Sequence, residues 1–169
     1  MKEITFSVKH KNITDRIKLY THYTGEARRN AGLPDKQAAA MQASADDETQ
    51  MGDHIENALS EVGNILSHYF AQFLAGENEG DGNDEKKEYT FTIAAPEHFP
   101  TASTANIEKS IENYVVRRTL QQWFVQHRPE ETALQAAEVQ AATAQLRTLL
   151  TRRSKPSIKS KKSNGNINL

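Results

Sequence analysis

Two short segments of the chain alternate strictly between apolar and polar residues, namely residues 3–9 and 88–94. A period of two with aromatic and β-branched residues is typical of β-strands, so we predict two strands that pair across the long segment between them. A two-stranded ribbon is only marginally stable alone, so it must lie on helices or be extended by another chain. The apolar face of this ribbon comprises Ile4, Phe6, Val8, Tyr89, Phe91 and Ile93.

Apolar residues spaced three or four positions apart predict four helices along the rest of the chain. The first begins near residue 14, with Thr14 or Asp15 as its N-terminal cap, and extends to residue 31 despite the interior Gly25. Residues 33–44 are compatible with either a loop or a helix.

The second predicted helix has the clearest amphipathic pattern. It follows Ser44 and starts with Asp46, Asp47 and Glu48, whose charges suit the positive end of a helix dipole. Its pattern continues until Gly76. The apolar stripe consists of Met51, Ile55, Leu59, Val62, Leu66, Tyr69 and Phe73.

The third predicted helix begins at Ser103 or Thr104 and ends near His127. The pair Trp123-Phe124 fits the apolar spacing of this helix, which favours a place in the core over an exposed anchor for a partner. We expect the second and third helices to share one core cluster. Its members are Ile55, Leu59, Val62, Leu66, Ile111, Val115, Leu120 and Trp123.

The fourth predicted helix covers residues 129–153. Pro129 stands at the first helical position, and Glu130 and Glu131 occupy the first turn, as is typical of a helix start. Pro156 prevents the helix from continuing. The expected apolar residues are Leu134, Ala137, Ala141, Ala144, Leu149 and Leu150.

These elements predict a mainly α fold, a small helical bundle with one two-stranded β element. We expect a single domain over residues 1–153, an acidic linker at 76–87 and a basic flexible tail at 154–169. Of the 169 residues only 37% are hydrophobic, so the core must be thin, and a partner is expected to complete the burial. No apolar run approaches the roughly 20 residues of a membrane span, and the first residues lack a signal-peptide pattern.

Charge is distributed unevenly along the chain. Residues 1–138 hold all 22 acidic residues and 14 basic ones, whereas residues 139–169 hold seven basic residues and no acidic one. A basic segment of this kind attracts phosphates, although it carries no aromatic residue for base stacking, and a merely solubilising tail is the other interpretation. The candidate interface residues are Arg152, Arg153, Lys155, Lys159, Lys161 and Lys162.

Sequence motifs of catalysis are missing from the chain. The sequence contains neither GxGxxG nor GxSxG, and its six histidines form no HxxxH pair. The absence of cysteine excludes disulfides, thiolate zinc sites and cysteine nucleophiles. The run from Asp81 to Glu85 imitates only a fragment of a calcium loop. We therefore predict no catalytic, cofactor-binding or metal-binding residues, and a protein that is not an enzyme.

Residues 44–156 resemble the head–tail connector (adaptor) proteins of tailed phages and prophages. In that family an acidic start leads into a long helix, a YTFTI-like strand follows, and a helix with a central Y-[IV]-V and a terminal W-[FL] meets a Pro-Glu. An Ala-rich helix with Ala-Glu and a basic end completes the pattern. The matching residues here are Pro96, Glu97, Tyr114, Val115, Val116, Trp123, Phe124, Pro129, Glu130, Ala137, Glu138, Leu149, Leu150, Arg152 and Arg153.

The resemblance implies a virion structural protein that forms a ring, usually of twelve copies, under the portal protein. Such a ring extends the DNA channel, offers a docking surface for tail-proximal connector proteins, and allows non-specific DNA contact. It implies a place at the virion neck, with the host cytoplasm as the site of assembly. Residues 10–43 and 76–87 have no counterpart in the pattern. The alternative is a nucleic-acid-binding accessory protein that uses its basic C-terminal tail.

Overall fold

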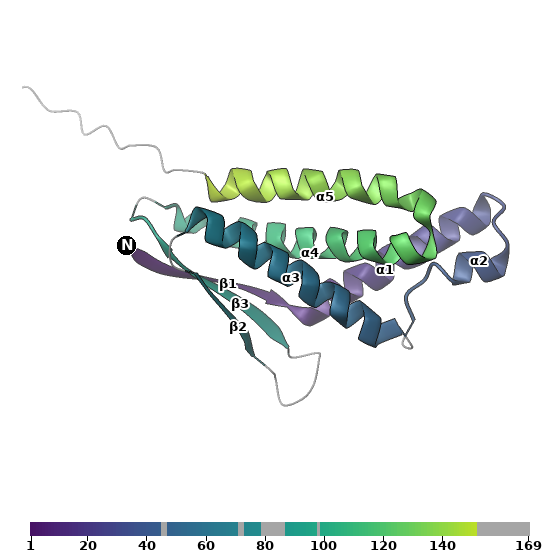
Figure 1. Cartoon of the computed structure of the whole chain (residues 1–169), viewed down its shortest axis with the longest axis horizontal. Helices are drawn as coiled ribbons and strands as arrows, with labels where there is room; N and C mark the ends of the chain where they lie inside the picture. The colour runs from purple at the N-terminus through teal and green to yellow at the C-terminus, as the bar shows by residue number, and fades with distance from the viewer. Residues whose placement is uncertain (45–46, 71–72, 79–86, 98, 152–169) are drawn as a thin grey trace, which may run out of the picture.

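The computed structural model describes residues 1–44, 47–70, 73–78, 87–97 and 99–151. The described chain is mostly helical, as predicted, and carries a small antiparallel sheet (Figure 1). The strands are β1 (Lys2–Lys9), β2 (Phe73–Asn78) and β3 (Glu88–Ala95). The helices are α1 (His10–Asn30), α2 (Asp35–Ala39), α3 (Glu48–Tyr69), α4 (Thr104–His127) and α5 (Pro129–Leu150), with a short 3₁₀ turn η3 (Thr101–Ser103) before α4.

The sheet has the order β1-β3-β2 with all neighbours antiparallel. The predicted pairing of the first strand with the segment at 88–94 is confirmed, with Phe6 opposite Phe91 and Ile4 opposite Ile93. The prediction of a two-stranded element is wrong, because β2 adds a third strand in which Ala75 lies opposite Phe91. The period of two therefore identified the two strands that bury a full apolar face.

The predicted second helix ends earlier than its apolar spacing indicated. Phe70 adopts an extended backbone, with φ −129° and ψ 123°, and its buried ring meets that of Phe99 edge-on at 5.8 Å. Phe73 and Gly76, expected at the end of the helix, belong to β2 instead. Backbone pairing with β3 outweighs the helical spacing of residues 73–76. The predicted linker thus starts as a strand, and residues 79–86 lie outside the described residues.

Helix α1 follows β1 without a loop, so the predicted start near residue 14 is wrong. Lys9 stands at the N-cap without a side-chain cap, and the Thr14 hydroxyl donates to the His10 carbonyl at 3.0 Å from inside the helix. The segment at 33–44, compatible with loop or helix, contains the single-turn α2. Gly25 allows α2 to approach closely, since a Cβ there would lie 2.8 Å from the Ala38 carbonyl oxygen.

Helix α4 lies at the centre of the molecule, between α3, α1, α5 and β1 (Figure 1). The predicted core cluster is confirmed, because all eight of its members are buried in one contiguous core. Trp123 and Phe124 are both fully buried, which confirms their predicted core role. The Trp123 indole N–H also donates to the Met41 carbonyl at 3.1 Å and thereby holds the segment after α2 against α4.

Helix α5 begins at Pro129 as predicted, but the predicted apolar face is largely wrong. Leu134 is 58% exposed, and Ala137, Ala141 and Ala144 are exposed as well. The side turned toward α4 consists of Glu131, Gln135, Ala142, Leu146 and Leu150. An Ala-rich helix has little amphipathicity of its own, so the contacts of Leu146 and Leu150 with the core decide which side is buried. The helix ends at Leu150, and the predictions about residues 152–169 fall outside the described residues.

A polar clamp connects α3 to α4. Arg118 donates to both carboxylate oxygens of Glu61 at 2.7–3.1 Å, and the Tyr114 hydroxyl donates to the same carboxylate at 2.6 Å. Burial raises the pKa of Glu61, but the hydrogen bonds from Arg118 and Tyr114 outweigh it and leave this pKa below its usual range. Burial, together with the bond to Glu61, raises the pKa of the Tyr114 hydroxyl.

Truncation of a buried leucine should destabilise the protein far more than truncation of an exposed leucine. Leu66→Ala, at a fully buried position, should lower the free energy of unfolding by about 2–5 kcal/mol because it leaves a cavity. The matched control Leu134→Ala, at the exposed position on α5, should change it by less than about 0.5 kcal/mol. Urea denaturation measures both values, and equal effects would contradict the burial described here.

Removal of the Glu61 charge should weaken the fold at neutral pH. Because its pKa is lowered in the fold, ionised Glu61 stabilises the protein above the unfolded pKa near 4.5, and this contribution is lost as pH falls through the lowered pKa. Glu61→Gln should therefore cost about 1 kcal/mol at pH 7, and the difference from wild type should shrink below pH 4.5. Urea denaturation across this pH range measures the difference, with the exposed Glu3→Gln as control. A loss of stability that does not depend on pH would contradict the clamp.

Candidate functional site

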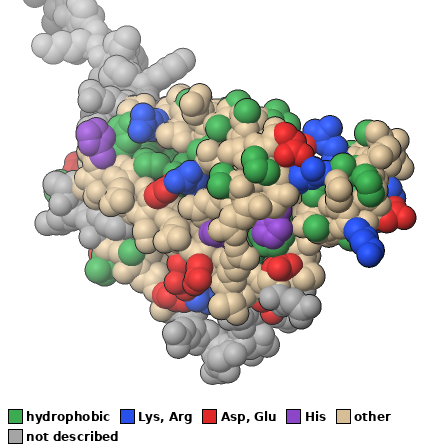
Figure 2. All heavy atoms as spheres, turned by 45° about the vertical axis from the view of Figure 1, so that its right-hand side comes forward, with side chains coloured by type: hydrophobic (Ala, Val, Ile, Leu, Met, Phe, Trp, Pro, Cys, Tyr) green, Lys and Arg blue, Asp and Glu red, His purple; other side chains and the backbone are tan. Residues whose placement is uncertain are grey.

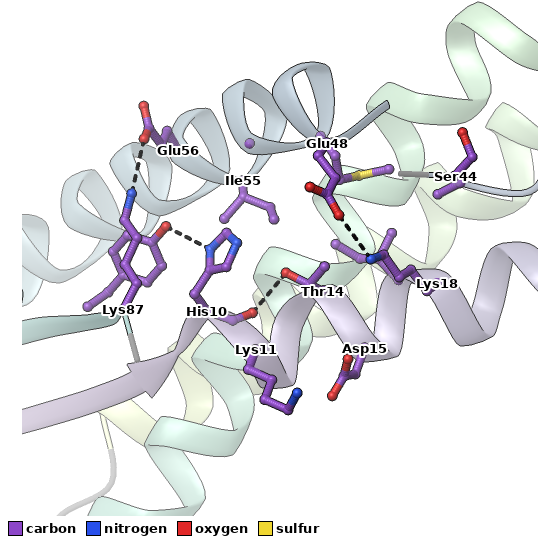
Figure 3. A pocket seen from close by; sticks show the side chains of 15 residues that line it. His10, Lys11, Thr14, Asp15, Lys18, Ser44, Glu48, Ile55, Glu56 and Lys87 are labelled. Atoms are coloured by element: carbon purple, nitrogen blue, oxygen red, sulfur yellow. Dashed lines mark hydrogen bonds and ion pairs between the residues drawn. The ribbon is translucent and has the colours of Figure 1, made fainter. Parts of the chain in front are cut away.

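A cavity of about 320 Å³ opens between α1, α3 and the start of β3 (Figure 3). Its apolar floor is formed by Ile17 of α1 and by Met51 and Ile55 of α3. The volume is at the lower end of the range for small-molecule sites, roughly 300–1,000 Å³. This cavity is more enclosed than the second hollow described below, and it combines apolar and titratable side chains.

Two ion pairs connect the walls of the cavity. Lys18 of α1 meets Glu48 of α3 at 3.4 Å, and Lys87 meets Glu56 of α3 at 3.6 Å. Figure 3 shows these two pairs at opposite ends of the cavity, with His10 between them. The His10 Nδ1 atom lies 3.0 Å from the Tyr89 hydroxyl, which joins the first turn of α1 to β3.

Lys87 makes several contacts across the cavity. It pairs with Glu77 of β2 as well as with Glu56, and its ammonium group lies 5.3 Å from the centre of the Tyr89 ring. The hydrogen bond to Glu77 raises the pKa of Lys87, so this side chain keeps its charge. Burial raises the pKa of Tyr89, so its phenol stays neutral and can hydrogen bond with His10.

The cavity is electrostatically balanced. Three lysines line it together with three carboxylates, namely Lys11, Lys18, Lys87, Asp15, Glu48 and Glu56. Such a balance favours neither an anionic nor a cationic ligand. In the described part of the chain no three His, Asp or Glu side chains come close enough to hold a metal ion. The arrangement suits a structural joint between two helices and the sheet, or a small neutral group.

A second, more open groove of about 590 Å³ lies beside the edge strand β2. Ser60, Gly63 and Ser67 of α3 form one side, and Ala75 and Gly76 of β2 form the other. A Cβ at Gly76 would lie 2.8 Å from the Thr90 hydroxyl, so only glycine fits this strand position without a shift. Neither hollow could be predicted from the sequence, because residues from distant segments line each of them and no regular spacing relates these residues.

The predicted interface residues are not brought to either hollow. Arg152, Arg153, Lys155, Lys159, Lys161 and Lys162 all lie outside the described residues. His54 lies on α3 with its Nε2 atom buried and without a hydrogen-bond partner in the described structure. Burial lowers the pKa of His54, as expected for a partly buried surface histidine.

Comparisons of the chain with family models, with curated proteins and with solved structures found no match. The helices of the described residues include none that is both long enough and apolar enough to cross a membrane. The resemblance drawn from the sequence motifs therefore stands without a matched relative.

Two glycines provide opposite tests of helix packing. Gly52 lines the cavity and a Cβ there would meet nothing within 4 Å, so Gly52→Ala should raise the free energy of unfolding by about 0.5–1 kcal/mol. Gly25→Ala should lower it by about 1–3 kcal/mol, because the new Cβ would press on the Ala38 carbonyl. Urea denaturation of both variants is decisive, and stabilisation by Gly25→Ala would refute the close α1–α2 contact.

Proposed function

We propose that the protein is a virion structural protein, a head–tail connector subunit of a tailed phage or prophage. In this proposal it forms a ring, of twelve copies, under the portal protein and extends the DNA channel. The ring docks tail-proximal connector proteins at the virion neck, after assembly in the host cytoplasm. The protein acts by assembly and not by catalysis.

The observation that carries the proposal is the agreement of the family motif with one structural unit. The motif residues Tyr114, Val115 and Val116 are buried in the middle of α4, and Trp123 ends the same buried stripe. Pro129 then occupies the first turn of α5. The motif thus describes the packing of the α4–α5 hairpin, which supports the resemblance at the level of element order.

Surface left uncovered on several elements is compatible with a subunit of a larger assembly. Leu19 and Tyr23 of α1, Leu74 of β2 and Leu134 of α5 are each at least 50% exposed. Figure 2 shows hydrophobic side chains that interrupt the polar surface along the upper part of one face, where α5 lies. In a ring, each subunit offers two different faces to its neighbours, and surface exposed in one copy is buried in the assembly.

The alternative function is nucleic-acid binding by the basic tail. Residues 139–169 hold seven basic residues and no acidic one, which favours contact with phosphates through counterion release. The net charge of −8 over residues 1–138 disfavours a broad nucleic-acid-binding face on the rest of the protein.

Assembly state is the direct test of the connector proposal. Light scattering and negative-stain microscopy of the purified protein, with and without a portal protein, should show rings that bind the portal. A protein that stays monomeric and ignores the portal would refute the proposal. Salt-sensitive DNA binding that disappears on deletion of residues 154–169 would favour the alternative.

Charge reversal in the tail should weaken docking to partner proteins without destabilising the fold. Lys159→Glu, Lys161→Glu and Lys162→Glu together should reduce docking to partner proteins, because exposed charges attract over a Debye length of about 8 Å. The melting temperature should not change, since a segment with little apolar surface adds little to the core. Lys36→Glu with Lys109→Glu, at exposed lysines of α2 and α4, is the control. Normal docking of the triple variant would indicate that the tail only solubilises the protein.

A further inference from the structure

Helix α5 places a row of apolar residues outward and, in its first half, polar residues inward. We name the exposed residues Leu134, Ala137, Ala141 and Ala144 the outer α5 face. On the inner side, Glu131 is 4% exposed and Gln135 is 8% exposed. The outer α5 face is thus less polar than the inner side at Glu131 and Gln135, so its exposure in the single chain calls for a cover.

Contacts of the inner side explain this inverted placement. Arg28 of α1 pairs with Glu131 and holds the start of α5 with its polar side inward. The Gln135 Oε1 and Thr132 Oγ1 atoms are buried there without a hydrogen-bond partner in the described structure. A helix that faces its own core with unsatisfied polar atoms gains little from that side alone. Burial of the outer α5 face by another molecule would add the stabilisation that this half of the helix lacks.

Helix α1 carries a second uncovered apolar stripe. Leu19 is 50% exposed, Tyr23 is 62% exposed, and Ala27 is exposed one turn further on. We name these three residues the outer α1 face. Their spacing of four positions places them on one side of the helix, opposite the buried Ile17 and Thr21. A large aromatic ring and a leucine on one exposed stripe are typical of a protein contact.

The two outer faces match in shape when the helices run antiparallel. If Tyr23 of one copy lies over Ala137 of the next, then Leu19 falls at Ala141, four positions away on each helix. In the same register Ala27 falls at Ala133, one position before Leu134. Large side chains therefore meet small ones along the stripe, which is the condition for close packing of two helices.

Charges at the ends of the two stripes favour the same direction. In the antiparallel arrangement the Asp15 end of α1 meets the Arg147 end of α5, and the Arg29 end meets the Glu130 end. All four side chains are exposed in the single chain, where Arg29 already pairs with Glu26 and Asp35, and Glu130 pairs with Arg128. A parallel arrangement would instead place Asp15 near Glu130 and Arg29 near Arg147. Charge complementarity of this kind determines orientation more than affinity.

We infer that neighbouring copies of this chain pack the outer α1 face of one against the outer α5 face of the next, antiparallel. The inference rests on the proposed ring and names the contact that would close it. Two different faces of the subunit take part, so the contact is heterologous and can propagate around a ring. Antiparallel pairing of α5 with α5 would be isologous and would stop at a dimer.

Engineered cysteines can test the contact, because the native chain has none. Leu19→Cys and Ala141→Cys would be prepared as single variants and as a double variant. They would be oxidised under conditions in which rings form. The double variant should give a ladder of cross-linked multimers, and a mixture of the single variants should give dimers. The pair Val125→Cys and Leu19→Cys, with Val125 exposed on α4, serves as the matched control and should not cross-link.

Three outcomes separate this inference from the proposed function. Rings on the microscope grid without a cross-linked ladder would overturn the α1–α5 contact while the connector proposal stands. Efficient self-cross-linking of Ala141→Cys alone would overturn it in favour of an isologous α5 pair. A ladder without rings, with or without the portal, would support the contact and refute the connector.

A charge placed on the stripe provides a second readout. Tyr23→Glu should abolish ring formation and leave the melting temperature within a few degrees of wild type, because the side chain is 62% exposed in the single chain. Val125→Glu, at a 53% exposed position of α4 outside both outer faces, should assemble normally. Normal rings from Tyr23→Glu would overturn the inference.

Discussion

Burial of α4 on several sides is the constraint from which the rest of the architecture follows. The sheet reaches this helix through β1, α3 packs along it, α1 crosses it, and α5 lies along its remaining side. Its buried residues include a tryptophan, a phenylalanine and a tyrosine, so much of the limited apolar content is concentrated there. In a chain with few large apolar residues, one such helix can organise a core that several amphipathic surfaces share.

Polar contacts define how the outer elements sit on this core. The Glu61–Arg118–Tyr114 clamp aligns α3 with α4. Lys87, immediately before β3, pairs with Glu77 of β2 and Glu56 of α3. The pairing of Arg28 with Glu131 joins the C-terminal end of α1 to the start of α5. Because these contacts are partly buried, they orient the elements more than they add to the free energy of folding.

The inferred neighbour contact combines α5, which belongs to the region of family resemblance, with a part of the chain outside that region. Resemblance to the connector family lies in the α3–α5 region, whereas residues 10–43 have no counterpart in the family motif. The structure shows that this additional segment forms α1 and α2 and packs on α4 through Ile13, Ile17 and Met41. It thereby also presents Leu19 and Tyr23 on the surface. A segment outside the shared motif would then supply one of the two faces of the subunit contact.

Local patterns along the chain were sufficient for the elements that carry a complete apolar face. The alternation at 3–9 and 88–94 predicted both strands and their pairing, and the spacing from Met51 to Leu66 predicted the face of α3 that is buried. These patterns reflect the period of the backbone itself, so they are readable without knowledge of the partner.

Tertiary contacts decided the features whose local signals are weak or contradictory. Strand β2 exists because β3 provides backbone partners for residues that continue a helical spacing. The inner side of the Ala-rich α5 depends on Leu146, Leu150 and the distant Arg28. The cavity joins His10, Glu48 and Lys87, which no sequence spacing relates. In each case the stabilising contacts come from residues far along the chain. A pattern within a short sequence segment therefore cannot predict them.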